Sequence, residues 1–163
     1  MKNYILTILL CSSTLLADDL SVRTGLGQDS GTGKILSLNY SRPLSKEIKF
    51  LKKFDFLKAD FEFGGYNPIN FLTSDYTMFG SIGLGFEVKT HGMYAKFSQG
   101  VGFISETGWR LNTLYQFPTT LSGGLYRDNG AIGIFYKHFS NGSGSRYNKG
   151  ANYLGMELSL NFW

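Results

Sequence analysis

The sequence predicts an all-β protein, an eight-stranded antiparallel transmembrane β-barrel of the outer membrane. Apolar and polar residues alternate with a period of two along most of the chain, which is typical of strands with one apolar and one polar face. Eight such runs of roughly 8 to 12 residues match the length that a tilted strand needs to cross a bilayer. The 163 residues include 21 glycines, 10 tyrosines and 14 phenylalanines, a composition that suits tight turns and aromatic girdles at membrane interfaces.

The first residues have the pattern of a signal peptide. A short basic start at 1–3 is followed by a largely apolar run at 4–10, and the small residue Ala17 precedes two aspartates. The apolar run is shorter than the roughly 20 residues of a membrane-spanning helix. We therefore expect a signal peptide over 1–17, cleaved after Ala17, and a single barrel domain over 18–163.

The cysteine content limits the covalent and metal cross-links that the chain can form, and the net charge limits its classes of partner. Cys11 is the only cysteine, so the mature chain would contain neither a disulfide nor a thiolate zinc site. Loss of Lys2 with the signal peptide lowers the net charge from +4 to +3. This excess is not gathered into a stripe, which argues against a nucleic-acid partner and agrees with a surface of lipid headgroups.

The eight alternating runs follow one another along the chain. They cover about 20–26, 36–41, 57–63, 78–88, 93–103, 114–126, 132–140 and 152–163. The sixth run is less regular because Pro118 cannot donate a ladder hydrogen bond. The chain ends in Phe162 and Trp163, a pair similar to the terminal aromatic signature of bacterial outer-membrane barrels.

Charged residues of both signs occupy the polar faces of these runs. They are Arg23, Lys58, Lys96 and Lys137 against Asp60, Glu62, Glu87 and Glu157. In a closed eight-stranded barrel such side chains face an interior that side chains nearly fill. Because the opposite charges can neutralise one another there, we predict a plugged lumen without a pore.

The lengths of the connections predict the orientation. Short turns at 90–92 and 127–130 belong on the periplasmic side, and longer loops belong outside the cell. The loop 140–150 then lies at the outer surface. His138 and Ser140, which end the seventh run, are expected at the rim of the outer leaflet, facing lipid.

His138 and Ser140 are the candidates for chemistry. Residues two apart on a strand share a face, and a polar pair facing lipid is costly unless it is paired or used. Serine is a weak nucleophile until a base such as histidine accepts its proton. Asn152 has the same outward parity and is the candidate to orient the imidazole, whereas the parity of Glu157 turns its carboxylate into the barrel. These residues predict a membrane-embedded serine esterase.

The segment His138-Phe139-Ser140-Asn141, followed by Asn148, Gly150 and a position 14 residues after the histidine, resembles the C-terminal signature of the lipid A 3-O-deacylase (PagL) family of eight-stranded outer-membrane enzymes. The resemblance implies a nucleophile at Ser140, a base at His138 and a third member at position 152. The family has glutamate there and this chain has Asn152. We expect Asn152→Glu to preserve or raise activity.

The same resemblance implies the substrate and the remaining site residues. The enzyme would remove an ester-linked 3-hydroxyacyl chain from the 3-O position of lipid A in lipopolysaccharide, through an acyl-enzyme and without a cofactor or metal. Asn141 and Asn148 match loop asparagines implicated in the oxyanion hole of the family. Arg146 and Lys149 are basic residues of the outer loop that we expect to bind the lipid A phosphates.

A second resemblance gives an alternative. His138, Ser140, Asn141-Gly142 and Asn152 are similar to the Ser-His-Asn arrangement of outer-membrane phospholipase A, a calcium-dependent dimer of twelve-stranded barrels. That resemblance implies that the Gly142 backbone N–H and calcium serve the oxyanion, and it leaves open a homodimer. The chain is too short for twelve strands. A catalytically impaired barrel with a structural or adhesive role is the third alternative.

Overall fold

The computed structural model describes residues 18–29, 33–44, 56–67, 76–107, 111, 113–141 and 150–162. Within these ranges the chain forms nine β-strands. They are β1 (Asp18–Gly27), β2 (Lys34–Pro43), β3 (Leu57–Tyr66), β4 (Thr77–Thr90), β5 (Met93–Ile104), β6 (Tyr115–Gln116), β7 (Thr119–Arg127), β8 (Gly130–Phe139) and β9 (Ala151–Phe162). None of the described residues belongs to a helix that is long and apolar enough to cross a membrane.

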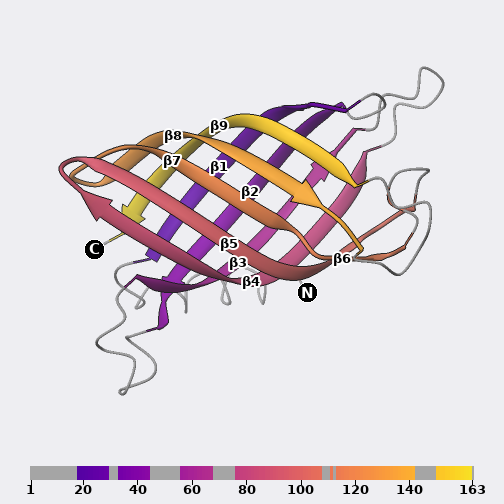
Figure 1. Ribbon diagram of the computed structural model, residues 1–163, viewed down its shortest axis with the longest axis horizontal. Helices are drawn as coiled ribbons and strands as arrows, with labels where there is room; N and C mark the ends of the chain where they lie inside the picture. Colours follow the sequence, from indigo (N-terminus) through magenta and orange to yellow (C-terminus); the bar gives the residue numbers. More distant parts are fainter. Residues whose placement is uncertain are drawn as a thin grey trace, which may run out of the picture.

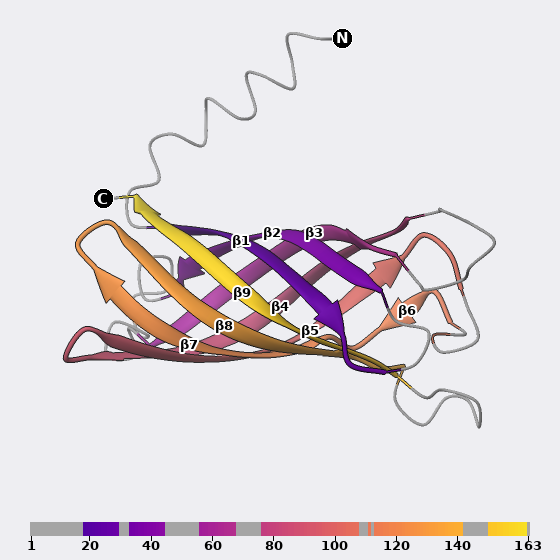
Figure 2. The ribbon, with the colours of Figure 1, turned by 90° about the horizontal axis from the view of Figure 1, so that it is seen from above.

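The strands form a closed antiparallel barrel (Figures 1 and 2). Apart from β6 and β7, each strand pairs with its neighbours along the chain, and β1 pairs with β9 from Asp18↔Phe162 to Gly27↔Tyr153, which closes the ring. β6 and β7 both pair with β5 and together make one of eight positions around the barrel. The eight-stranded prediction is therefore confirmed, but the sixth predicted run is broken at 117–118, where Pro118 lacks an N–H for the ladder.

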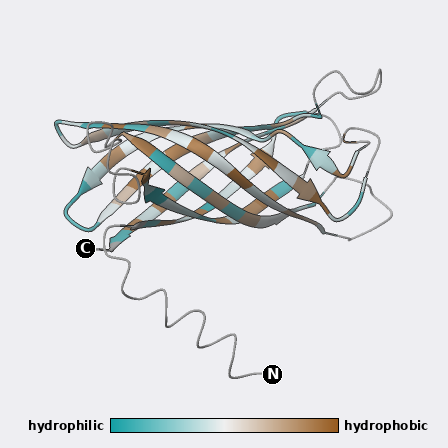
Figure 3. Ribbon diagram, turned by 90° about the horizontal axis from the view of Figure 1, so that it is seen from below, coloured by the Kyte–Doolittle hydropathy of each residue, from teal (hydrophilic) through white to brown (hydrophobic). Residues whose placement is uncertain are grey.

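The two faces of each strand differ as the alternation predicts. On β8, Ile132, Ile134 and Tyr136 point outward and are exposed, whereas Phe135 and Lys137 point inward and are each 1% exposed. The same alternation gives the chequered pattern of brown and teal along the strands in Figure 3. The outer wall is thus apolar over most of its area, as expected of a surface that meets lipid.

The predicted interior charges are buried and paired. Glu62 Oε2 accepts from Lys137 Nζ at 2.6 Å and from Arg23 Nη1 at 3.0 Å, and Arg23 also pairs with Glu157. Further ion pairs join Lys96 to Asp60 and Lys58 to Glu87, each at 2.6 Å, and Lys58 also contacts Asp19. Two cavities among these charges each have a volume of about 10 Å³, close to the space of one water molecule.

The connections differ between the two ends of the barrel. The turn end, at the left in Figure 1, carries the two short turns β4–β5 and β7–β8 together with the β2–β3 connection. At the first of these, His91 and Gly92 have φ of +48° and +77°, the left-handed pair of a type I′ turn. The opposite end, which we call the loop end, carries the connections β1–β2, β3–β4, β5–β6 and β8–β9.

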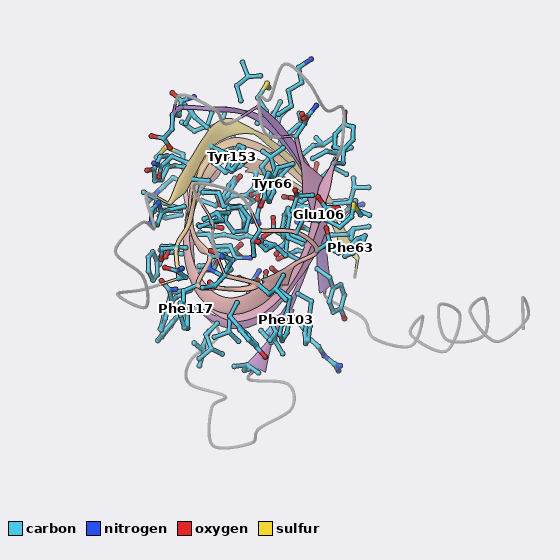
Figure 4. The ribbon with its side chains drawn as sticks, turned by 90° about the vertical axis from the view of Figure 1, so that its right-hand side faces the viewer. Phe63, Tyr66, Phe103, Glu106, Phe117 and Tyr153 are labelled. Carbon is cyan, nitrogen blue, oxygen red and sulfur yellow. The ribbon has the colours of Figure 1, made fainter. Side chains whose placement is uncertain are left out.

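An aromatic cluster fills the interior at the loop end. Phe139 packs on Phe79 with ring centroids 5.0 Å apart and on Tyr153 at 6.1 Å, and Tyr66 lies 5.9 Å from both Phe139 and Tyr153. All four side chains are buried, and Figure 4 shows Tyr66 and Tyr153 inside the ring of strands. Because Phe139 and Tyr153 directly follow His138 and Asn152 along the chain, this cluster anchors the two strands that carry the candidate site.

Candidate active site

His138 and Asn152 face each other across the β8–β9 ladder on the outer wall. They are direct register partners, and their side chains meet with His138 Nδ1 and Asn152 Oδ1 2.7 Å apart. Both residues are half-buried. The shared outward parity inferred from the sequence therefore brings the imidazole and the amide into hydrogen-bond contact.

Asp29 determines which way the Asn152 amide faces. Asp29 Oδ2 accepts from Asn152 Nδ2 at 2.7 Å and from the Asn152 backbone N–H at 3.0 Å. A carboxylate only accepts hydrogen bonds, so the amide NH2 must face Asp29 and Oδ1 must face the imidazole. His138 Nδ1 is then the donor in its bond to Asn152. The neutral imidazole is left with its lone pair on Nε2, the atom that a general base uses.

The closure of the barrel brings Asp29 to this place. The β1–β9 ladder runs to Gly27↔Tyr153, and the next residue, Gln28, donates its N–H to the Asn152 carbonyl at 2.9 Å. Asp29, two residues after the end of β1, therefore lies directly beside the start of β9. The connection that follows the first strand and the start of the last strand thus supply adjacent members of one hydrogen-bonded group.

Tyr136 makes a second bond to the same amide oxygen. Its hydroxyl donates to Asn152 Oδ1 at 2.5 Å. Tyr136 is the outward-facing residue that precedes His138 on β8, and it is 42% exposed. An amide oxygen has two lone pairs, and the His138 and Tyr136 donors occupy both.

Ser140 directly follows β8, which ends at Phe139, one residue earlier than the predicted run. The Ser140 carbonyl accepts from the Phe117 N–H at 2.5 Å. Thr119 pairs with His138 two residues earlier on β8. The bond between Phe117 and Ser140 therefore lies at the next outward-facing pair of the same register. The backbone at Ser140 therefore continues the β8 ladder. The Phe117 side chain lies outside the ring in Figure 4.

Gly150 lies against the edge of the imidazole that carries Cε1 and Nε2. A Cβ at this position would be 2.6 Å from His138 Cε1 and 3.4 Å from Nε2. Its φ is +67°, a left-handed conformation that glycine adopts without penalty. Only glycine fits this position without moving the backbone or the histidine ring.

The other predicted site residues have separate outcomes. Asn141 is described and is buried, with 8% of its surface exposed. Gly142, Arg146, Asn148 and Lys149 lie outside the described residues. Glu157 is inside the barrel, as its parity predicts, where it contacts Arg23 and accepts from the Tyr94 hydroxyl at 3.0 Å. Within the described ranges, no group of three or more His, Cys, Asp or Glu side chains is placed to hold a metal ion.

A polar row crosses the outer wall at the level of His138. It continues to Thr119 on β7, whose hydroxyl contacts Gln99 Oε1 on β5 at 2.6 Å. The next outward row toward the turn end consists of Leu121, Tyr136 and Leu154, which pair across β7, β8 and β9 and are all exposed. The candidate site thus lies at a boundary between polar side chains and an apolar wall.

Sequence reasoning did not identify Asp29 or the contact of Tyr136 with Asn152. A signal for Asp29 existed, because closure of a barrel with an even number of strands places the first long connection beside the start of the last strand. Applied to β1 and β9, that rule brings the residues after Gly27 next to Asn152.

Comparison with known proteins agrees with this architecture. The crystal structure of the outer membrane enzyme PagL matches with a TM-score of 0.59 at 17% identity, covering 87% of this chain and 98% of that one. The N-terminal β-barrel domain of Pseudomonas aeruginosa OprF matches with a TM-score of 0.63 at 12% identity, covering 90% and 97%. At these identities the likeness shows the outer-membrane barrel fold alone. No curated protein sequence matches significantly.

The family comparison is more specific. The family described as lipid A 3-O-deacylase (PagL) matches residues 36–161. This span runs from β2 to the last residues of β9, so it contains His138, Ser140 and Asn152. The chain belongs to the lipid A 3-O-deacylase (PagL) family.

Proposed function

We propose that this protein is an outer-membrane serine esterase that removes the 3-hydroxyacyl chain ester-linked to the 3-O position of lipid A. One observation carries the proposal: His138, bonded through Nδ1 to Asn152 on the lipid-facing wall, lies two residues before Ser140 on one continuous register. Membership in the lipid A 3-O-deacylase family supports the substrate class. Ser140 is the proposed nucleophile, His138 the base and Asn152 the group that orients the base.

In the acylation step, Ser140 Oγ attacks the ester carbonyl carbon while His138 Nε2 takes the hydroxyl proton. The Nδ1–Oδ1 bond to Asn152 supports this role because it keeps the Nε2 lone pair available. When the tetrahedral intermediate collapses, the bond from carbonyl carbon to the sugar 3-oxygen breaks. The proton on Nε2 passes to that oxygen, and the acyl group remains on Ser140.

In the deacylation step, His138 Nε2 removes a proton from a water molecule that attacks the acyl-enzyme carbonyl. The bond to Ser140 Oγ then breaks, and the proton returns to that oxygen. The products are a free 3-hydroxy fatty acid and a lipid A molecule with an unsubstituted 3-hydroxyl. For the oxyanion that forms in both steps, the proposed donors are Asn141, Gly142 and Asn148. Loss of one such donor costs roughly 3–4 kcal/mol of transition-state stabilisation in well-studied hydrolases.

The chemistry of the outer wall supports a lipid substrate. The polar row at His138 and Thr119 borders the apolar row of Leu121, Tyr136 and Leu154. An acyl ester has the same polarity pattern, since its carbonyl lies between a hydrophilic sugar and a hydrocarbon chain. We place the loop end at the outer leaflet, where lipid A resides, so that the acyl chain lies along the apolar wall. Arg146 and Lys149 are the proposed partners of the phosphates.

Asn152 gives the phospholipase alternative its one specific support, since it contacts His138 in the position of a Ser-His-Asn triad. Under that alternative the substrate would be a phospholipid and the reaction would require calcium. The eight-stranded barrel agrees with the deacylase family and differs from the twelve strands of outer-membrane phospholipase A.

Mass spectrometry of lipid A and of phospholipid, each incubated with refolded protein, tests the proposal. The wild type should remove one hydroxyacyl group from lipid A, with or without a calcium chelator, and Ser140→Ala should remove none. Ser105→Ala, which alters an exposed serine at the same end of the barrel, is the matched control and should retain activity. Hydrolysis by Ser140→Ala would refute the serine mechanism. If the protein instead produced lysophospholipid from phospholipid, and a calcium chelator prevented this reaction, the phospholipase alternative would be established.

A further inference from the structure

We propose that Asp29 is a positioning residue of this site, and that its carboxylate takes the place of the charge that Asn152 lacks. The inference rests on the proposed function, in which Ser140 is the nucleophile and His138 the base. It adds a fourth member from the opposite end of the chain. The group then runs from Asp29 through the Asn152 amide to His138 and Ser140.

Asp29 contacts both the side-chain amide and the backbone of Asn152. One oxygen, Oδ2, accepts from both Nδ2 at 2.7 Å and the backbone N–H at 3.0 Å. Two donors from one residue on one carboxylate oxygen define the orientation of the amide more strictly than a single bond would. Rotation of the amide by 180° would set its carbonyl oxygen against the carboxylate and its NH2 against His138. Asp29 therefore determines the tautomer of the imidazole.

The charge of Asp29 also reaches His138. An amide orients a histidine but offers no negative charge to stabilise the imidazolium that forms when the base takes a proton. A carboxylate that accepts an amide N–H polarises that amide and increases the negative partial charge on its oxygen, which is the atom bonded to His138 Nδ1. The amide thus transmits part of the effect that a directly bonded carboxylate has.

This arrangement changes the expected effect of restoring the family glutamate. In Asn152→Glu, the new carboxylate would lie close to Asp29, because the amide that it replaces is 2.7 Å from Asp29 Oδ2 and glutamate is only one methylene longer. Two carboxylates so close to each other disfavour the charged state of both. Asn152→Glu alone should therefore lower activity, and the second change Asp29→Asn should restore it by removing the like charge and supplying a donor.

The rate of labelling by a fluorophosphonate probe tests this directly, because the probe phosphonylates an activated serine hydroxyl with loss of fluoride and does not require lipid A recognition. Asp29→Asn should lower the labelling rate about 10- to 100-fold, the scale seen when outer partners of metal-bound histidines are removed. In the Asn152→Glu background, Asp29→Asn should instead raise the rate at least about tenfold. Glu106→Gln, an exposed carboxylate after β5 at the same end, is the control and should leave the rate unchanged.

The reversal of sign separates positioning from a structural role. If Asp29 only held the β1–β2 connection in place, Asp29→Asn would have the same sign in both backgrounds, and that result would overturn the inference. A single-variant rate within twofold of the wild type would overturn it as well. With lipid A, the variant should lower kcat and leave KM unchanged, and the heat-dependent gel shift of a folded barrel should persist. Absence of Ser140 labelling in the wild type would overturn the proposed function and this inference together.

Discussion

Gly150→Ala isolates the contribution of imidazole placement to the proposed reaction. A Cβ at Gly150 would lie 2.6 Å from His138 Cε1, and ordinary van der Waals contact begins near 3.4 Å. The ring must therefore shift by about 0.8 Å, unless the backbone moves instead. The other close contact, Phe139 O at 2.9 Å, belongs to a backbone ladder and cannot yield easily.

The expected magnitudes follow from this geometry. Misplacement of a catalytic group by about 1 Å costs roughly 100-fold in rate, so Gly150→Ala should lower kcat for lipid A deacylation by that order. The left-handed φ of +67° should add about 1–2 kcal/mol of destabilisation. The barrel should nevertheless fold, because Gly150 precedes β9 and lies outside its ladder.

Gly92→Ala is the matched control. Gly92 also has a left-handed φ, at +77°, but its added Cβ would meet only Tyr126 O at 3.8 Å, at the turn end of the barrel. Urea unfolding should show a loss of stability in both variants because both positions have a left-handed φ, with the larger loss in Gly150→Ala, and deacylation measured by mass spectrometry should fall in Gly150→Ala alone. Equal activities in the two variants would refute the placement of His138 against Gly150.

Three further predictions test other contacts. Tyr136→Phe removes one of two donors to Asn152 Oδ1 and should lower kcat about 2- to 12-fold in the lipid A assay, since a neutral hydrogen bond is worth about 0.5–1.5 kcal/mol; a complete loss would contradict this. ¹⁵N spectra should show the proton of neutral His138 on Nδ1, and the second histidine, His91, can be removed for assignment. Glu62→Gln should destabilise the barrel by roughly 3–5 kcal/mol in urea because it leaves two buried cations short of their shared partner, and a midpoint equal to that of the wild type would refute that pairing.

The faces of the strands could be predicted because period-two alternation alone decides them. Lys137 was expected inside and His138 outside, and the ladder confirms both. Strand ends were harder to predict. The break at 117–118 depends on the missing N–H of Pro118, whereas the extension of β9 back to Ala151 depends on its pairing with Phe139. Such ends are determined by the neighbouring strand rather than by the local pattern.

Only the part of the candidate site that lies on the adjacent strands β8 and β9 could be predicted from the sequence. His138 and Asn152 are register partners on adjacent strands, so parity and spacing were sufficient to pair them. Asp29 is 123 positions from Asn152 in the sequence, and no local pattern links the two. Their contact depends on the register of β1 with β9. The deciding information was therefore the closure of the barrel, which brings the two ends of the chain together.

The two faces of β8 carry different tasks within a few residues: the inward face stabilises the barrel, and the outward face carries the candidate site. Lys137 neutralises Glu62 in the interior, and its neighbour His138 lies on the outer wall, where we propose that the substrate binds. Substitutions along this strand should therefore divide by parity, with inward positions altering whether the barrel folds and outward positions altering what it does once folded. Evolution could change the substrate of such a wall while leaving its ion pairs untouched, because the two sets of residues share a backbone but not a face.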